Sequence, residues 1–206
     1  MKRQFILILI ITIFSCGWFH ASAQYGLRLS YIKHSGDMGY LVKPAIGYEL
    51  VLASTNISDR FQGNGCIGFM SLNTWLDTVP TGTFLHNDDG ITLLPSYMVY
   101  HDITVFIFGI NLEYKILDRR FTPVVGADIY MNLIEYDYDN FVPNLVSSSV
   151  TNEHAGSFSI LPRIGVSYEI NERFLFRSGF GKNLGFDNNF NSIYFWKSYF
   201  EAIFYF

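Results

Sequence analysis

The sequence is poor in charge, in basic residues and in cysteine. Only 16% of its 206 residues are charged, whereas soluble domains carry about a quarter. Lys and Arg total 14 against 18 Asp and Glu, so the excess of positive charge that marks nucleic-acid binders is absent, and we expect no nucleic-acid partner. After residue 23 there is neither an apolar run long enough for a spanning helix nor a helical apolar period over three turns. These absences argue against helical bundles and coiled coils.

Aromatic residues are abundant instead. The chain is 50% hydrophobic and 18% aromatic, with 20 Phe, 14 Tyr and 3 Trp. This exceeds what one core of this size needs and argues against a disordered chain. A soluble all-β protein or a membrane β protein remains.

The first 23 residues have the three parts of a secretory signal. A positive start at Met1–Arg3 precedes an apolar run over Phe5–Phe14, and small residues at Ala21–Ala23 suit a signal peptidase. We therefore predict a cleaved signal over residues 1–23 and a mature domain over residues 24–206. The alternative is a lipoprotein, in which Cys16 would be acylated, but Phe14 fits that motif poorly.

Cys66 is the single cysteine of the predicted mature chain, so no disulfide framework is expected. Its neighbours Gly65, Ile67 and Gly68 offer no base that would activate a nucleophile. We therefore interpret Cys66 as a small strand residue.

Period-two alternation recurs between clusters of Gly, Asn, Asp and Pro and predicts strands. The segment 91–115 is too long for a membrane crossing of about 9–11 residues, so residues 91–101 should project beyond the membrane or break at Pro95. The eight predicted strands cover residues 25–35, 40–54, 61–78, 91–115, 121–138, 157–170, 174–183 and 192–206.

The connections between these strands alternate in length. Short charged turns alternate with longer polar stretches, a habit of bacterial outer-membrane barrels that also places both termini on the short-turn side. The short turns are 56–60, 117–120 and 171–173; the other connections are 36–39, 79–90, 139–156 and 184–191.

Charges and large apolar residues occupy opposite faces of the predicted strands. Small residues are interleaved with the charges, which suits the narrow lumen of an eight-stranded barrel better than a solvated exterior. A membrane barrel is therefore favoured over a soluble carrier with an apolar cavity, and the mixed charges should pair across the lumen. The predicted lumen charges are Arg28, Lys43, Glu49, Glu113, Lys115, Asp128, Arg163, Glu169, Arg177, Lys197 and Glu201.

Aromatic residues near the strand ends predict interfacial girdles. The terminal segment Ser198–Phe206 alternates up to a final aromatic, and it resembles the carboxy-terminal signal that the barrel-insertion machinery recognises. The predicted girdle includes Tyr40, Tyr114, Tyr168, Tyr194 and Phe206.

Two strand–turn–strand segments, Phe108–Asp128 and Leu161–Phe174, carry a more specific resemblance. With the signal that ends just before Gln24, they make the chain similar to the outer-membrane β-barrel domain family abundant in Bacteroidota. This resemblance implies an architecture and brings no catalytic residues with it.

Residues with catalytic or metal-binding chemistry are scattered. His34, His86, His101 and His154 lack partners at zinc-ligand spacing. Ser96 and His101 are five residues apart, so on one strand they would point to opposite faces and could not form a dyad, even with Asp102 nearby.

The alternating carboxylates Glu135, Asp137 and Asp139 fail the helix–loop–helix calcium pattern, because Asn140 and Val146 replace the required Gly and Glu. We expect a solvated loop base; the alternative is a divalent-cation site among lipopolysaccharide phosphates.

The sequence thus predicts an all-β, eight-stranded antiparallel up-and-down transmembrane barrel of the outer membrane, monomeric, with a structural or surface-interaction role. We predict no catalytic residue, no metal and no cofactor. The expected partners are outer-membrane lipids, lipopolysaccharide and the insertion machinery, the last through the strand ending at Phe206. The alternatives are a narrow solute channel, an outer-membrane lipid hydrolase and a soluble carrier.

Overall fold

The computed structural model describes residues 24–35, 41–75, 78–87, 90–141, 150–187 and 192–205. The predicted signal over residues 1–23 lies outside this part, and its cleavage stays a prediction. No helix in the described ranges is both long and apolar enough to cross a membrane.

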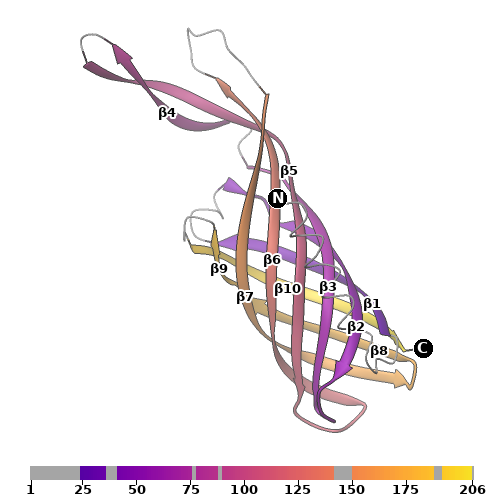
Figure 1. Ribbon diagram of the computed structural model, residues 1–206. Helices are drawn as coiled ribbons and strands as arrows, with labels where there is room; N and C mark the ends of the chain where they lie inside the picture. Colours follow the sequence, from indigo (N-terminus) through magenta and orange to yellow (C-terminus); the bar gives the residue numbers. More distant parts are fainter. Residues whose placement is uncertain are drawn as a thin grey trace, which may run out of the picture.

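The described chain is built almost wholly from antiparallel strands (Figure 1). The strands are β1 (Gln24–Ser35), β2 (Ala45–Asn56), β3 (Phe61–Leu72), β4 (Thr78–Asn87), β5 (Gly90–Lys115), β6 (Phe121–Phe141), β7 (Val150–Asn171), β8 (Phe174–Lys182), β9 (Leu184–Asp187) and β10 (Ser192–Tyr205).

Eight of these strand positions close into a barrel. The sheet runs β1-β2-β3-β5-β6-β7-β8-β10, and β10 pairs back onto β1, from Gln24 opposite Tyr205 to Ser35 opposite Tyr194. The short β9 continues the path of β8, because it pairs with the same two neighbours, β7 and β10. The predicted eight-stranded up-and-down topology is confirmed.

One side of the barrel is much taller than the other. The pairing of β3 with β5 ends at Leu72 opposite Ile103, but β5 continues outward to Gly90. We call this projection the outer sheet: β4 together with residues 90–102 of β5, 135–141 of β6 and 150–156 of β7. Figure 1 shows it rising above the barrel, with the β4–β5 hairpin bent to one side.

The prediction that residues 79–90 form a loop was wrong, because residues 78–87 form β4 and pair with β5. The predicted connection over residues 79–90 is a polar stretch that contains Pro80 and Gly82. An edge strand tolerates both, since one row of its backbone groups needs no partner. Of the two options for residues 91–101, projection is confirmed, and Pro95 lies within the strand opposite Gly82.

Four strand boundaries also differ from the prediction. β2 begins at Ala45 rather than at residue 40, β3 ends at Leu72 rather than at residue 78, β7 begins seven residues earlier than residue 157, and residues 184–187 are paired as β9. For β7 and β9 a neighbouring strand supplies partners for a segment whose own pattern is weak, whereas beyond the ends of β2 and β3 the chain forms an isolated bridge between Val42 and Thr74. For β7 the partner is the outer end of β6, from Asp139 opposite Val150.

The side chains alternate between a polar lumen and an apolar exterior. On β1, Arg28 and Ser30 are buried while Leu27 and Leu29 are 69% and 50% exposed. On β10, Lys197 and Glu201 are buried while Trp196 and Phe200 are exposed. This is the inverse of a soluble carrier and the pattern of a transmembrane barrel, so the predicted assignment of the two faces is confirmed.

The apolar exterior has the height of a membrane. On β6 it extends from Phe121 to Leu133, and the next outward residue is Glu135. Twelve residue steps span about 40 Å along a strand, or about 28 Å at a tilt of about 45°, close to the usual band of about 25 Å. Tyr114 and Tyr168 lie exposed at the short-turn end and Tyr194 near the other end, as girdle residues should. Tyr40 and Phe206 lie outside the described residues.

Candidate functional site

Eight ionisable side chains fill the lumen, four of each sign. They are at most 3% exposed, although they come from seven different strands. The eight are Arg28, Glu49, Glu113, Asp128, Arg163, Arg177, Lys197 and Glu201.

Arg28 connects four strands across this lumen. Its Nε donates to Glu201 Oε2 at 2.6 Å, and its Nη1 lies 3.3 Å from Glu49 Oε2 and 3.4 Å from Asp128 Oδ2. The Arg28 side chain on β1 therefore ties together carboxylates from β10, β2 and β6.

Two further arginines extend these contacts into a closed ring. Arg163 donates to Asp128 at 2.7 Å and to Glu113 at 3.0 Å. Arg177 lies 3.0 Å from Glu113 and also 3.0 Å from Glu201, the carboxylate that Arg28 binds. We call the resulting cycle of alternating sign the charge ring. It runs through Arg28, Asp128, Arg163, Glu113, Arg177 and Glu201.

Lys197 and Glu49 form a pair attached to this ring. The Lys197 ammonium donates to Glu49 and to the Tyr130 hydroxyl, the second at 2.8 Å. Tyr130 in turn donates to Asp128 at 2.8 Å. Arg28 then joins both ends of this chain, because it contacts Glu49 and Asp128.

Aromatic and glycine residues complete the filling. The Arg28 and Arg163 guanidinium carbons lie 5.0 and 5.1 Å from the Tyr199 ring centre. Gly165 and Gly179 face each other on β7 and β8, and a Cβ at Gly179 would come within 2.7 Å of the Tyr199 hydroxyl and 2.4 Å of a backbone oxygen. Glycine is required there because Tyr199 and the neighbouring strand leave no room for a side chain.

The lumen at this level is packed rather than wet. A water-filled pore leaves its lining side chains accessible, whereas Arg28, Glu113 and Glu201 are at most 1% exposed. Equal numbers of opposite charges, paired at short distances, compensate the desolvation that each would otherwise suffer. This arrangement joins the strands together and keeps each of the eight charged groups at most 3% exposed.

Three predicted lumen charges lie nearer the barrel ends. Lys115 and Glu169 pair at 2.6 Å beside the short turns and are partly exposed. Lys43 lies at the opposite rim, with its ammonium 5.8 Å from the Trp75 ring centre. Lys43 also lines a small rim hollow of about 110 Å³ together with Tyr100 and His101.

The outer sheet has two chemically different faces. The face that continues the lumen carries stacked tyrosines, and Glu153 accepts hydrogen bonds from Tyr138 at 2.8 Å and Tyr136 at 2.9 Å. These bonds, with that of Tyr138 first, lower the pKa of Glu153. Partial burial, and then the bond to Glu153, raises the pKa of Tyr136 to about 12.

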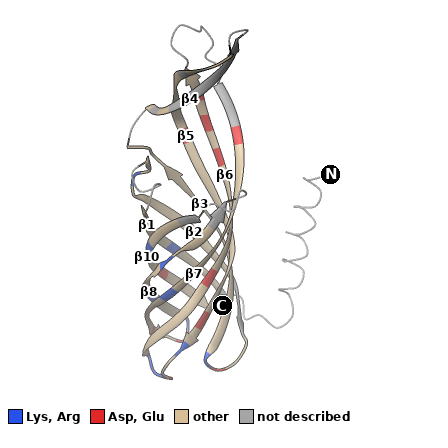
Figure 2. Ribbon diagram, turned by 90° about the vertical axis from the view of Figure 1, so that its left-hand side faces the viewer, with Lys and Arg blue, Asp and Glu red and all other residues tan. Residues whose placement is uncertain are grey.

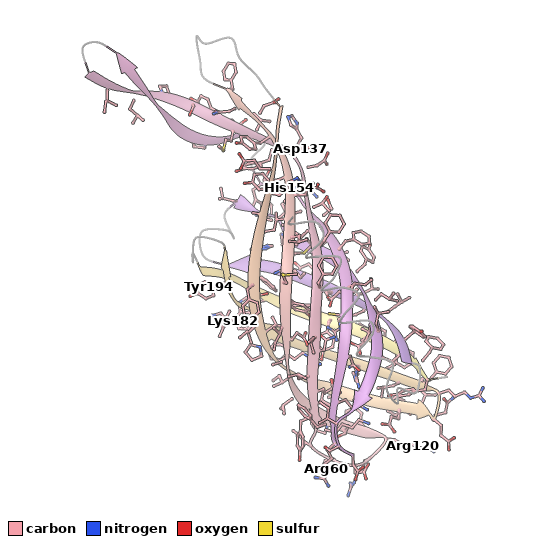
Figure 3. The ribbon with its side chains drawn as sticks, viewed as in Figure 1. Arg60, Arg120, Asp137, His154, Lys182 and Tyr194 are labelled. Atoms are coloured by element: carbon pink, nitrogen blue, oxygen red, sulfur yellow. The ribbon has the colours of Figure 1, made fainter. Side chains whose placement is uncertain are left out.

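The other face of the outer sheet carries the predicted carboxylates. Glu135 lies 3.5 Å from His154 Nδ1, and Asp139 lies 3.0 Å from His101 Nε2. Figure 3 shows Asp137 and His154 together at the base of the projection, far from Arg60 and Arg120 at the short-turn end. Among the described residues, no three His, Cys, Asp or Glu side chains come together to hold a metal ion.

The remaining candidate residues are dispersed. Ser96 is 1% exposed whereas the His101 side chain is 46% exposed, and His101 is paired with Asp139 rather than with the serine. His34 is buried against Phe195, with ring centres 5.8 Å apart. Cys66 is a buried lumen residue near Asn111, as its interpretation as a small strand residue requires. The structure describes His86 only as part of the β4 backbone.

Sequence reasoning did not single out Tyr130 and Tyr199, although both share the lumen parity of the charged residues. That shared parity was the signal that could have identified them as partners. It also passed over Lys33 and Lys182, which lie on the apolar exterior.

The comparisons with known proteins support the fold. No protein-family profile matches the chain, and no curated protein matches it either. The chain is similar to the crystal structure of Neisserial surface protein A, with a TM-score of 0.56 and 13% identity over 90% of this chain and 98% of that one. The resemblance to a Bacteroidota family therefore stays a prediction.

Two further solved structures are more distant. One is Ail, the attachment invasion locus protein of Yersinia pestis, in complex with the heparin analogue sucrose octasulfate (TM-score 0.49, 10% identity, 90% of this chain and 97% of that chain). The other is the N-terminal β-barrel domain of Pseudomonas aeruginosa OprF (TM-score 0.43, 11% identity, 91% and 100%). These neighbours are small outer-membrane barrels.

Proposed function

We propose that this protein is a non-conducting barrel of the bacterial outer membrane that holds the outer sheet at the cell surface for contact with other molecules. The observation that carries the proposal is the contrast between a lumen packed with paired charges and a sheet built well beyond the membrane band. A channel would need an accessible lumen, and a hydrolase would need a serine and a base in contact.

The outer sheet suits contact because its edges are open. Within the described residues, β4 pairs only with β5, and residues 150–156 of β7 pair only with β6. Unpaired strand edges offer backbone donors and acceptors to an added strand.

The charge of the outer sheet favours cationic partners. Its described residues include Asp102, Glu135, Asp137, Asp139 and Glu153 but no Lys or Arg. Figure 2 shows acidic positions along the projecting strands, while the basic positions lie lower in the barrel. A surface of one sign attracts the opposite charge and repels its own.

The proposal is tested by conductance together with surface labelling. Purified protein in a planar bilayer should show no current steps. In a Cys66→Ser background, cysteine at Ile91 should react on intact cells with a membrane-impermeant maleimide, and cysteine at Arg119 should not. Both positions are exposed. Steady conductance, or labelling at Arg119 alone, would contradict the proposal.

A further inference from the structure

The apolar exterior carries two lysines in one line across three neighbouring strands. Lys33 on β1 lies opposite Trp196 on β10, and Trp196 lies opposite Lys182 on β8. Both lysines are exposed on the outward parity of their strands. We call Lys33 and Lys182 the lysine pair. Neighbouring strands are about 4.8 Å apart, so the two backbones are separated by about 10 Å.

Lysines are unusual on this lipid-facing surface of the barrel. The other outward residues on the three strands are apolar, aromatic or small, from Tyr25 to Tyr31 on β1 and from Phe174 to Phe180 on β8. A charge on a lipid-facing surface is costly at mid-membrane and becomes tolerable only near the interface.

The height of the lysine pair matches the outer interface. Lys33 is eight residues beyond Tyr25, about 27 Å along the strand or about 19 Å along the membrane normal at 45°. A lysine side chain extends the remaining few ångströms to the headgroups. Figure 3 places Lys182 and Tyr194 at the rim opposite the short turns.

Aromatic rings hold Lys182 in position. Its ammonium lies 5.5 Å from the Trp196 ring centre and 5.8 Å from that of Tyr194. Among the described side chains, no carboxylate forms an ion pair with Lys33 or Lys182. Within the described part of the chain, both positive charges are thus open to a ligand that approaches from the lipid side.

We propose that the lysine pair, with Trp196 between its members, binds the phosphates of a phosphorylated glycolipid of the outer leaflet, such as lipid A. The ligand class follows from position and charge: it must be anionic, must lie in the leaflet plane, and must present its charge where the acyl chains end. Two lysines whose backbones lie about 10 Å apart can both reach a headgroup with two phosphates. The assignment rests on the proposed function, because it requires this rim to face the outer leaflet.

The test is native mass spectrometry of the folded protein in detergent, titrated with bisphosphorylated lipid A. Each lysine near a lipid surface contributes about five-fold in affinity, so Lys33→Ala/Lys182→Ala should bind about 25-fold more weakly. Lys33→Arg/Lys182→Arg should bind like the parent. Arg60→Ala/Arg120→Ala, which removes the same charge at the other end, should also leave binding unchanged.

Two further ligands separate the lipid from its phosphate. The parent protein should bind dephosphorylated lipid A about as weakly as the double alanine variant binds it. Inorganic phosphate at equal concentration should not displace lipid A from the parent protein. Equal binding by the double alanine variant, equal binding of dephosphorylated lipid, or displacement by inorganic phosphate would overturn the assignment.

A heat-shift gel would verify that each variant remains a folded barrel. Since conductance and surface labelling do not depend on the lysine pair, a negative lipid result would leave the proposed function standing.

Discussion

At the scale of single residues, the charge ring is the feature of this protein that should be most sensitive to substitution. Six buried ionic groups lie in contact, and each depends on partners from other strands. Pairing offsets the cost of burial only while every member is present. A single substitution should therefore cost more than the loss of one contact.

Arg28→Ala tests this dependence. It leaves Glu201 and Glu49 short of a buried partner, and breaking such a pair costs about 3–5 kcal/mol. We expect the free energy of unfolding in lipid vesicles, measured by urea titration with a heat-shift gel, to fall by about that amount.

Lys115→Ala is the matched control. Its partner Glu169 has a side chain that is 41% exposed, and an exposed pair contributes about 0.2–1 kcal/mol. Equal losses for the two variants would show that the charge ring does not stabilise the barrel.

At the scale of elements, the outer sheet stands outside the membrane and responds to pH through Glu153. Hydrogen bonds from Tyr138 and Tyr136 lower the pKa of Glu153 below its ordinary 4.5. A carboxyl group with a lowered pKa stabilises the folded sheet above its ordinary pKa, and this contribution disappears as the pH falls through the lowered value. The sheet should therefore loosen in acid.

At high pH, ionisation of Tyr136 limits the stability of the outer sheet. The pKa of Tyr136 is raised from 10 to about 12, so its contribution is complete below pH 10 and is lost as the pH rises to about 12. The protection factors of the β6–β7 outer amides, which compare the observed hydrogen-exchange rate with the intrinsic rate at each pH, should be highest between these limits. Glu153→Gln should abolish the acid limb, while exchange at barrel residues such as Ile129 should be unaffected. An unchanged acid limb in this variant would contradict the role of Glu153.

At the scale of the whole molecule, the packed lumen makes the barrel a solid structure rather than one with a water-filled pore. Cys66 reports on this directly, since it is buried beside Asn111 inside the lumen. We expect a water-soluble maleimide to leave it unmodified in the folded protein and to label it fully after boiling in detergent. A cysteine introduced at the exposed Arg119 should react in both states. Rapid labelling of Cys66 before boiling would indicate a wet lumen.

Local alternation determined much of this architecture. The period of two assigned Arg28, Glu49 and Asp128 to one face and Leu27 and Leu29 to the other, because successive strand side chains must point in opposite directions. Eight crossings, the closed barrel and the orientation of its faces followed from this pattern together with the alternating connection lengths.

Tertiary structure decided what local pattern does not encode. β4 exists because the projecting half of β5 supplies its partners, despite Pro80 and Gly82. The charge ring depends on strand register, which brings Arg28, Arg163 and Arg177 from three strands to carboxylates on β5, β6 and β10. The lysine pair likewise arises only where β1, β10 and β8 are neighbours. A sequence determines which face a side chain occupies, because that depends on its own strand alone; barrel closure determines which side chains meet, because that depends on the alignment of strands distant in the chain.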